Sequence, residues 1–133
     1  MAEFEIPKHG TICWQELATK DLAAAKEFYR EMFGWKLEQS KVAPMEYTEI
    51  HFKDRAVGGM LEIDERFGDP PPPSHWTTYM AVDNTDETVA KIKENGGSIK
   101  QEPFDVPGVG RMAFGSDPSR APFAIIQFEK PGN

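Results

Sequence analysis

The sequence predicts an α+β fold made of two paired βαβββ modules whose strands form a concave, eight-stranded cup. Short apolar stretches typical of strands surround only two longer stretches with the periodicity of amphipathic helices. The order strand, helix and three strands occurs twice along the chain. One helix covers one face of each four-stranded half and leaves the other face open. Two such half-sheets placed side by side would form a surface suited to a small ligand.

The chain is predicted to be one domain over residues 1–133, because a chain of this length buries a single core. Within it we expect a first module at residues 9–63 and a second module at residues 75–128. Residues 64–74 are predicted to be the linker between them, since they contain four consecutive prolines. Such a run favours an extended polyproline conformation and cannot lie inside a sheet.

The first module opens with GTICWQEL (residues 10–17), an apolar stretch typical of a strand. Residues 21–34 carry a helical apolar stripe, with Thr19 or Asp21 as the N-cap and Gly34 as the C-cap. Three short strands are expected after this helix, at residues 35–40, 45–52 and 56–63.

The second module repeats this order with a strand at residues 75–82 and a helix at residues 83–97 that ends in Gly-Gly. Three more strands are expected at residues 98–106, 110–116 and 121–128. Sliding one half by 63 residues places Trp14 on Thr77 and Gly34 on Gly97. The two halves therefore resemble each other in structure more than in sequence.

Composition limits the partners. The net charge is −7 and no cluster of lysine and arginine is present, so neither nucleic acid nor a membrane is expected as a partner. No apolar run approaches the roughly 18–20 residues that a membrane span needs, and the first ten residues lack the apolar region of a signal peptide. The single cysteine, Cys13, suits a reducing compartment. We expect a cytoplasmic protein.

Several motifs carry a resemblance to a known family: WQELATKDLAAAKEFYREMFGW, GGML, PSHWTTYMAVDN, VPGVGR and DPSRAPFAIIQ. Together they cover residues 10–128 and resemble the vicinal oxygen chelate superfamily, which includes glyoxalase I, extradiol dioxygenases and bleomycin-resistance proteins. The resemblance implies the glyoxalase/bleomycin resistance/dioxygenase fold. It does not specify an activity, because the superfamily supports several chemistries on one scaffold.

The resemblance also implies four inward-facing metal-ligand positions, in the first and last strand of each half. Counting along the strands places them at Trp14, Glu62, Thr77 and Ala124. A divalent ion needs three or four nitrogen or oxygen donors at about 2.0–2.6 Å, and only Glu62 is a strong ligand. We therefore expect no metal and no other cofactor. The alternative is a divalent metal at a shifted site that uses His75 with Glu16 or Glu62.

Alternation along the strands predicts which side chains line the cup. Residues expected to face the helices are Cys13, Leu17, Leu61, Ile63, Phe123 and Ile125. Residues expected to bind the ligand in the cup are Trp14, Glu16, Glu62, His75, Thr77, Tyr79 and Arg111.

The candidates for catalysis among these residues are Glu16, Glu62 and His75. A carboxylate on a half-buried apolar surface can act as a general base, or it can hold a cationic or hydroxylated ligand that stacks on the aromatic rings. The simpler interpretation is that Glu16 and Glu62 are solvated or pair with Arg111. The simpler interpretation of His75 is that it makes a hydrogen bond at the mouth of the pocket.

Three hypotheses for function follow. In the first, the protein binds a small organic molecule in the cup without the family metal. In the second, it is a glyoxalase- or dioxygenase-type enzyme with a shifted metal site or a carboxylate base, which predicts metal retention or a pH-dependent rate. In the third, it is a protein-interaction module whose sheet edges pair with another chain. A homodimer is expected under all three.

Overall fold

The structure, a computed structural model, describes residues 5–43 and 45–130. They form two compact units. The N-unit lies within residues 14–77. The C-unit contains two described segments, residues 5–13 and residues 78–130. The predicted first module began at residue 9, but the chain up to Cys13 packs with the C-unit. There the Gly10 N–H donates to the Ala81 carbonyl at 2.7 Å, which holds the segment around Gly10 against Ala81.

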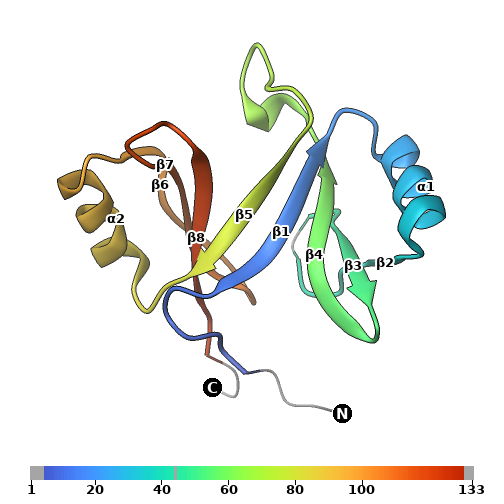
Figure 1. Ribbon diagram of the computed structural model, residues 1–133, viewed down its shortest axis with the longest axis horizontal. Coiled ribbons are helices and arrows are strands. Elements are labelled where there is room, and N and C mark those ends of the chain that lie inside the picture. Colours follow the sequence, from blue (N-terminus) through green and yellow to red (C-terminus); the bar gives the residue numbers. More distant parts are fainter. Residues whose placement is uncertain (1–4, 44, 131–133) are drawn as a thin grey trace. The chain divides into compact units, whose positions relative to one another are not determined.

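The N-unit has one helix beside a four-stranded sheet (Figure 1). Its elements are β1 (Ile12–Thr19), α1 (Leu22–Phe33), β2 (Lys36–Gln39), β3 (Thr48–Phe52), β4 (Arg55–Glu62) and a 3-10 turn η1 (Glu65–Phe67). The strands lie in the order β2-β3-β4-β1. β1 runs parallel to β4, and the other neighbours are antiparallel.

The C-unit has the same plan. Its elements are β5 (His75–Ala81), of which residues 75–77 fall in the N-unit, α2 (Thr85–Glu94), β6 (Ser98–Val106), β7 (Gly110–Ser116) and β8 (Pro122–Phe128). The strands lie in the order β6-β7-β8-β5, with β5 parallel to β8. The predicted α+β class and the repeated βαβββ order are confirmed. The joining of both sheets into a concave cup stays a prediction.

Local sequence determines where the helices begin and end. The Asp21 side chain accepts a hydrogen bond from the Ala24 N–H at 3.0 Å, so Asp21 is the N-cap of α1. Gly34 adopts a left-handed conformation with φ of 69° and donates its N–H to the Arg30 carbonyl. Asn84 caps α2 in the same way as Asp21 caps α1. The predicted caps Asp21 and Gly34 are confirmed.

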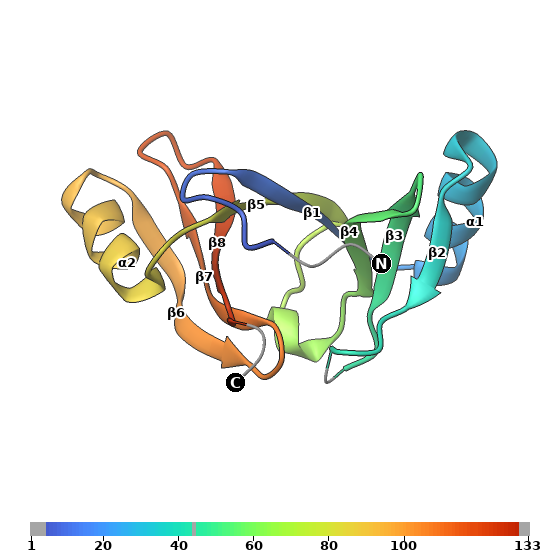
Figure 2. The ribbon, with the colours of Figure 1, turned by 90° about the horizontal axis from the view of Figure 1, so that it is seen from below.

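In each unit the helix lies beside one face of the sheet (Figure 2). A hydrophobic core lies between the two. In the N-unit, Leu17, Ile50 and Met60 are buried, and side chains of α1 pack against them. The corresponding buried residues of the C-unit are Val82, Val89, Ala113 and Ile125. These contacts define the helix-covered face of each sheet. The opposite side is called its open face below.

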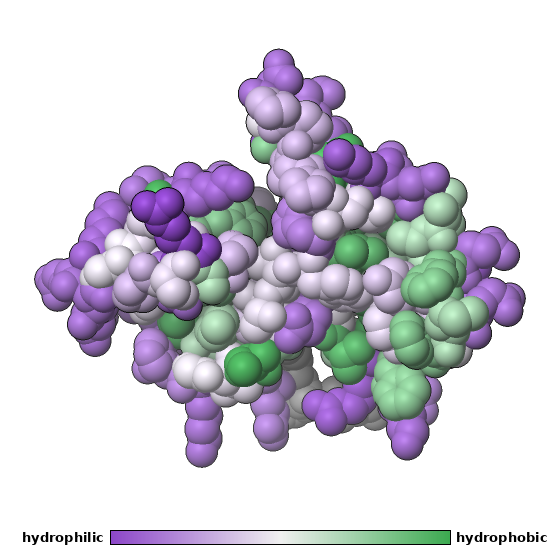
Figure 3. Space-filling view, turned by 45° about the horizontal axis from the view of Figure 1, so that its top comes forward, coloured by the Kyte–Doolittle hydropathy of each residue, from purple (hydrophilic) through white to green (hydrophobic). Residues whose placement is uncertain are grey.

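Helix α1 exposes three large apolar side chains beside its charged ones. Phe28, Met32 and Phe33 are 54%, 58% and 56% exposed. Figure 3 shows hydrophobic side chains gathered at the right-hand end of the molecule, where α1 lies. Neither helix of the described residues is both long and apolar enough to cross a membrane. A group of exposed apolar side chains of this kind is typical of a surface that packs against another molecule.

Candidate functional site

Three side chains form a hydrogen-bonded chain on the open face of the N-unit. The Trp14 indole Nε1–H donates to the Tyr47 hydroxyl at 2.8 Å, and the Tyr47 hydroxyl donates to Glu16 Oε1 at 2.9 Å. Trp14 and Glu16 stand on the same side of β1, because alternate residues of a strand face the same way and Leu17 faces α1. Two predicted ligand-binding residues are thus joined through a tyrosine that the sequence did not reveal.

The direction of this chain follows from its chemistry. An indole nitrogen can only donate, so the Tyr47 oxygen accepts from Trp14 and keeps its single proton for Glu16. Burial, followed by the negative charge of Glu16, raises the pKa of Tyr47 above its ordinary value. The hydroxyl therefore stays protonated and continues to donate to Glu16.

Gly59 makes room for the tyrosine ring. It lies opposite Glu16 in the β1–β4 pair, on the same face of the sheet. A Cβ atom at this position would overlap the ring and hydroxyl of Tyr47. Because Gly59 has no side chain, Tyr47 packs directly against β4.

Charged side chains surround this chain on the neighbouring strands. Glu38 and Glu49 lie opposite each other in the β2–β3 pair. The His51 Nε2 atom is 3.0 Å from Glu49 Oε1 and 3.5 Å from Glu38 Oε2. Lys36 lies 3.1 Å from Glu38 and holds the pKa of that carboxyl below its ordinary value. The charge of Glu49 also raises the pKa of Tyr47. This part of the sheet is therefore rich in carboxylates.

Glu62 does not lie where the sequence placed it. Its Oε1 atom accepts a hydrogen bond from the Leu22 N–H, at the first turn of α1, at 3.0 Å. Glu62 shares a face of β4 with Met60, which is buried beneath α1. Leu61, predicted to face the helix, consequently lies on the open face with Gly59. The predictions for Glu62 and Leu61 are corrected, and Glu62 leaves the candidate site.

The C-unit contains a matching hydrogen bond. Gln127 Oε1 accepts from the Thr85 N–H at the first turn of α2, at 3.0 Å. The counterpart of Glu62 is therefore Gln127 and not Ala124, the residue reached by counting along the sequence. An acceptor from the last strand of each unit satisfies one of the unpaired N–H groups at the start of the helix.

This role predicts how Glu62 variants behave. Glu62→Leu should lower the free energy of unfolding by about 1 kcal/mol, because the Leu22 N–H loses its acceptor. Glu62→Gln should cost less than about 0.5 kcal/mol, since the amide oxygen of Gln127 already fills this role in α2. Urea unfolding measures both values. Equal stability of the wild type and Glu62→Leu would contradict the assignment.

Three predicted residues share the open face of β5. The His75 Nδ1 atom lies 2.7 Å from the Pro73 carbonyl oxygen. A carbonyl only accepts, so Nδ1 carries a proton. This contact agrees with the simpler interpretation of His75 as a residue that hydrogen-bonds at the end of a loop. Thr77 is partly buried, and Tyr79 is buried with its ring 6.1 Å from that of Phe114. Tyr79 thus packs among aromatic side chains of the C-unit.

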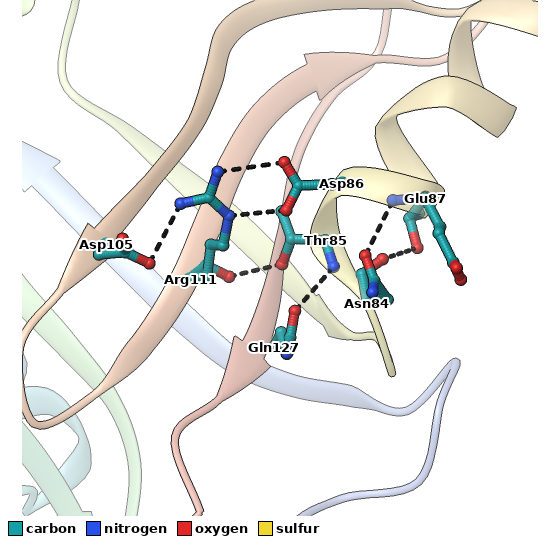
Figure 4. A network of polar contacts seen from close by, with 8 residues as sticks. Asn84, Thr85, Asp86, Glu87, Asp105, Arg111 and Gln127 are labelled. Atoms are coloured by element: carbon teal, nitrogen blue, oxygen red, sulfur yellow. Dashed lines mark hydrogen bonds and ion pairs between the residues drawn. The ribbon is translucent and has the colours of Figure 1, made fainter.

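Arg111 forms ion pairs inside the C-unit (Figure 4). Its Nε atom lies 2.7 Å from Asp86 Oδ2, and its Nη1 atom lies 3.1 Å from Asp105 Oδ1. The Arg111 guanidinium holds the pKa of the Asp86 carboxyl below its ordinary value. The carboxylate partners of Arg111 are therefore Asp86 and Asp105, in place of Glu16 or Glu62, which the simpler interpretation had offered as one alternative. Arg111 instead joins β7 to the first turn of α2 and to β6.

Beside this network the C-unit has a cavity of about 430 Å³. Residues lining it include Val82, Asp83, Asp105, Val106, Arg111 and Phe128. The volume falls in the range of small-molecule sites. However, the Arg111 guanidinium already contacts two carboxylates, so it is not a strong anchor for a ligand.

The superfamily's metal does not fit the residues present. Trp14 and Ala124 have no metal-binding side-chain donor, Thr77 has only a neutral hydroxyl, and Glu62 binds the start of α1. Among residues 5–43 and 45–130, no three His, Cys, Asp or Glu side chains are grouped so that they could hold an ion. Within these described residues, His75 does not belong to such a group.

A model of the Glyoxalase/Bleomycin resistance protein/Dioxygenase superfamily matches residues 11–125. The chain belongs to this superfamily. Within it, the chain is 37% identical over 119 residues to CFP32 of Mycobacterium tuberculosis, named as a candidate glyoxylase, covering 89% of this chain and 44% of CFP32. It is 32% identical over 127 residues to the anthracycline biosynthesis protein DnrV of Streptomyces peucetius, covering 87% of this chain and 46% of DnrV. The chain thus spans about half the length of these curated relatives.

Solved structures support the superfamily fold. A hypothetical protein, BH1468 of Bacillus halodurans, aligns with a TM-score of 0.66 at 15% identity, covering 93% of this chain and 98% of that chain. Methylmalonyl-CoA epimerase of Mycobacterium tuberculosis aligns with a TM-score of 0.59 at 14% identity, covering 88% of this chain and 87% of the epimerase chain. At these identities the likeness concerns the fold alone.

Proposed function

We propose that the chain binds a small organic molecule on the open face of the N-unit, at Trp14, Tyr47 and Glu16. The observation that carries this proposal is the hydrogen-bonded chain of these three side chains. It places an aromatic surface beside a carboxylate whose position is fixed, and such pairs of groups are typical of ligand sites. The name of DnrV supports an aromatic ligand, because anthracyclines are planar aromatic molecules.

We further propose that binding takes place without the superfamily's metal and without another cofactor. The side chains at the superfamily's metal-ligand positions support this. On the open faces they supply at most one oxygen donor, a threonine hydroxyl. The ligand would then be held by stacking on Trp14 and by hydrogen bonds, with no ion to polarise it.

Nuclear magnetic resonance of the ¹⁵N-labelled chain tests the ligand site. We expect small aromatic molecules at about 1 mM to shift the Trp14 indole N–H resonance, which Trp14→Phe identifies, because weak stacking contacts bind in this range. The indole signal of Trp76 is the control, because Trp76 lies on β5 and faces away from its open face. If the aromatic set shifts the Trp76 signal and leaves that of Trp14 unchanged, the proposed site is wrong.

The same samples test whether the chain binds a metal ion. Titration with Zn²⁺, Ni²⁺, Fe²⁺ and Mn²⁺ should give no tight uptake, and His75→Ala should behave like the wild type. The glyoxylase name of CFP32 favours a second candidate function, a glyoxylase-type enzyme. About one tightly bound ion per chain, lost in His75→Ala, would favour that enzyme over the binding protein.

The homodimer expected from the sequence also stays a proposal. The exposed apolar side chains of α1, Phe28, Met32 and Phe33, provide a surface for a second copy.

A further inference from the structure

Tyr47 controls which hydrogen bonds the proposed site offers to a ligand. The Trp14 N–H, which could otherwise donate to a ligand, is used by the Tyr47 oxygen at 2.8 Å. The Tyr47 proton is used by Glu16 at 2.9 Å. Glu16 therefore accepts from Tyr47 through its Oε1 atom. The indole donor of Trp14 is thus already paired, and a ligand that stacks on this ring meets the carboxyl group of Glu16 beside it.

We infer that Tyr47 is a specificity-determining residue that makes the site select ligands which donate hydrogen bonds, cationic planar amidines above all, and reject carboxylates. This inference rests on the proposed function, since it assigns a ligand class to the same three side chains. Tyr47 acts by fixing its neighbours and does not itself need to touch the ligand.

The surrounding charges favour the same class of ligand. Glu49 and Glu38 stand on the neighbouring strands. Lys36 and His51 pair with these carboxylates, and the charge of Lys41 also acts on Glu38. An anionic ligand beside Glu16 would meet like charges, whereas a cation would gain a charge-assisted hydrogen bond and contact with the indole face of Trp14. The inference does not rest on these charges alone, because the paired indole N–H would disfavour an acceptor even without them.

Benzamidine and benzoate are suitable probes. Both are planar aromatic molecules of similar shape, but benzamidine is cationic and donates, whereas benzoate is anionic and accepts. In titrations of the full chain followed at the Trp14 indole N–H, benzamidine should bind at least tenfold more tightly than benzoate. In Tyr47→Phe, the Trp14 N–H is released and the benzamidine-to-benzoate ratio should fall at least fivefold.

Glu16→Gln provides a second variant. Its amide oxygen still accepts from Tyr47, so the chain is kept while the charge is lost, and the preference for benzamidine should also fall. An unchanged ratio in Tyr47→Phe, with both probes still bound, would overturn the inference and leave the binding site standing. If neither probe shifts the Trp14 signal of the wild type while other aromatic molecules do, the assigned ligand class is wrong. If no aromatic molecule shifts it, the proposed function fails.

Discussion

Gly58→Ala should lower the free energy of unfolding by about 3 kcal/mol, the upper part of the range for overpacked sites. Gly58 faces Gln15 across the parallel β1–β4 pair. A Cβ atom at Gly58 would overlap the Gln15 backbone carbonyl oxygen. A backbone atom cannot move away without disturbing the β1–β4 pairing, so the cost falls on the whole N-unit. Urea unfolding at constant pH measures this loss.

Gly59→Ala is the matched control, one residue away on the same strand. Here a Cβ atom would meet only the far end of the Tyr47 side chain, which can rotate away. We expect a loss of about 1 kcal/mol, from the hydrogen bonds to Trp14 and Glu16. The Trp14 indole N–H resonance should move, and aromatic ligands should bind more weakly. Equal loss of stability in the two variants would show that neither glycine has the role assigned to it.

The secondary structure could be predicted because its signals are local. The apolar stripe of α1, its N-cap Asp21 and its C-cap Gly34 lie within 14 consecutive residues. The repeat was visible for the same reason, since each half has its own helix between its own strands. A strand that alternates clearly, such as β1, also revealed its faces, so Trp14 and Glu16 were placed correctly relative to Leu17.

The faces of β4 could not be predicted in this way. Met60 and Leu61 are both apolar, and the two glycines before them have no side chain to mark a face. The alignment of Met60 with Leu17 decides the faces, and it depends on the register between strands far apart in sequence. The hydrogen bond from Leu22 to Glu62 links residues 40 positions apart, which no local pattern indicates.

Tyr47 was missed for a similar reason. It lies 33 residues from Trp14 and 31 residues from Glu16, and it stands just before β3. The alternation of Tyr47 and Glu49 with Thr48 and Ile50 indicates a shared face for the first two. It does not indicate that this face lies beside Trp14, because β4 stands between β3 and β1 in the sheet.

Thr85→Val and Thr48→Val should change stability in opposite directions, although both threonines are almost fully buried. Thr85 is 0% exposed, and its hydroxyl donates to the Arg111 carbonyl at 2.7 Å. Valine has nearly the same shape but no donor, so the Arg111 carbonyl would lose this partly buried hydrogen bond. We expect Thr85→Val to lower the free energy of unfolding by about 2 kcal/mol.

Thr48 is 1% exposed, and within residues 5–43 and 45–130 its hydroxyl has no hydrogen-bond partner. Replacing this hydroxyl by a methyl group removes the cost of burying an unpaired polar group and keeps the shape. Thr48→Val should therefore raise the free energy of unfolding by about 1 kcal/mol. The two variants, compared by urea unfolding, should differ by about 3 kcal/mol. A loss of stability in Thr48→Val would mean that its hydroxyl has a partner in solution.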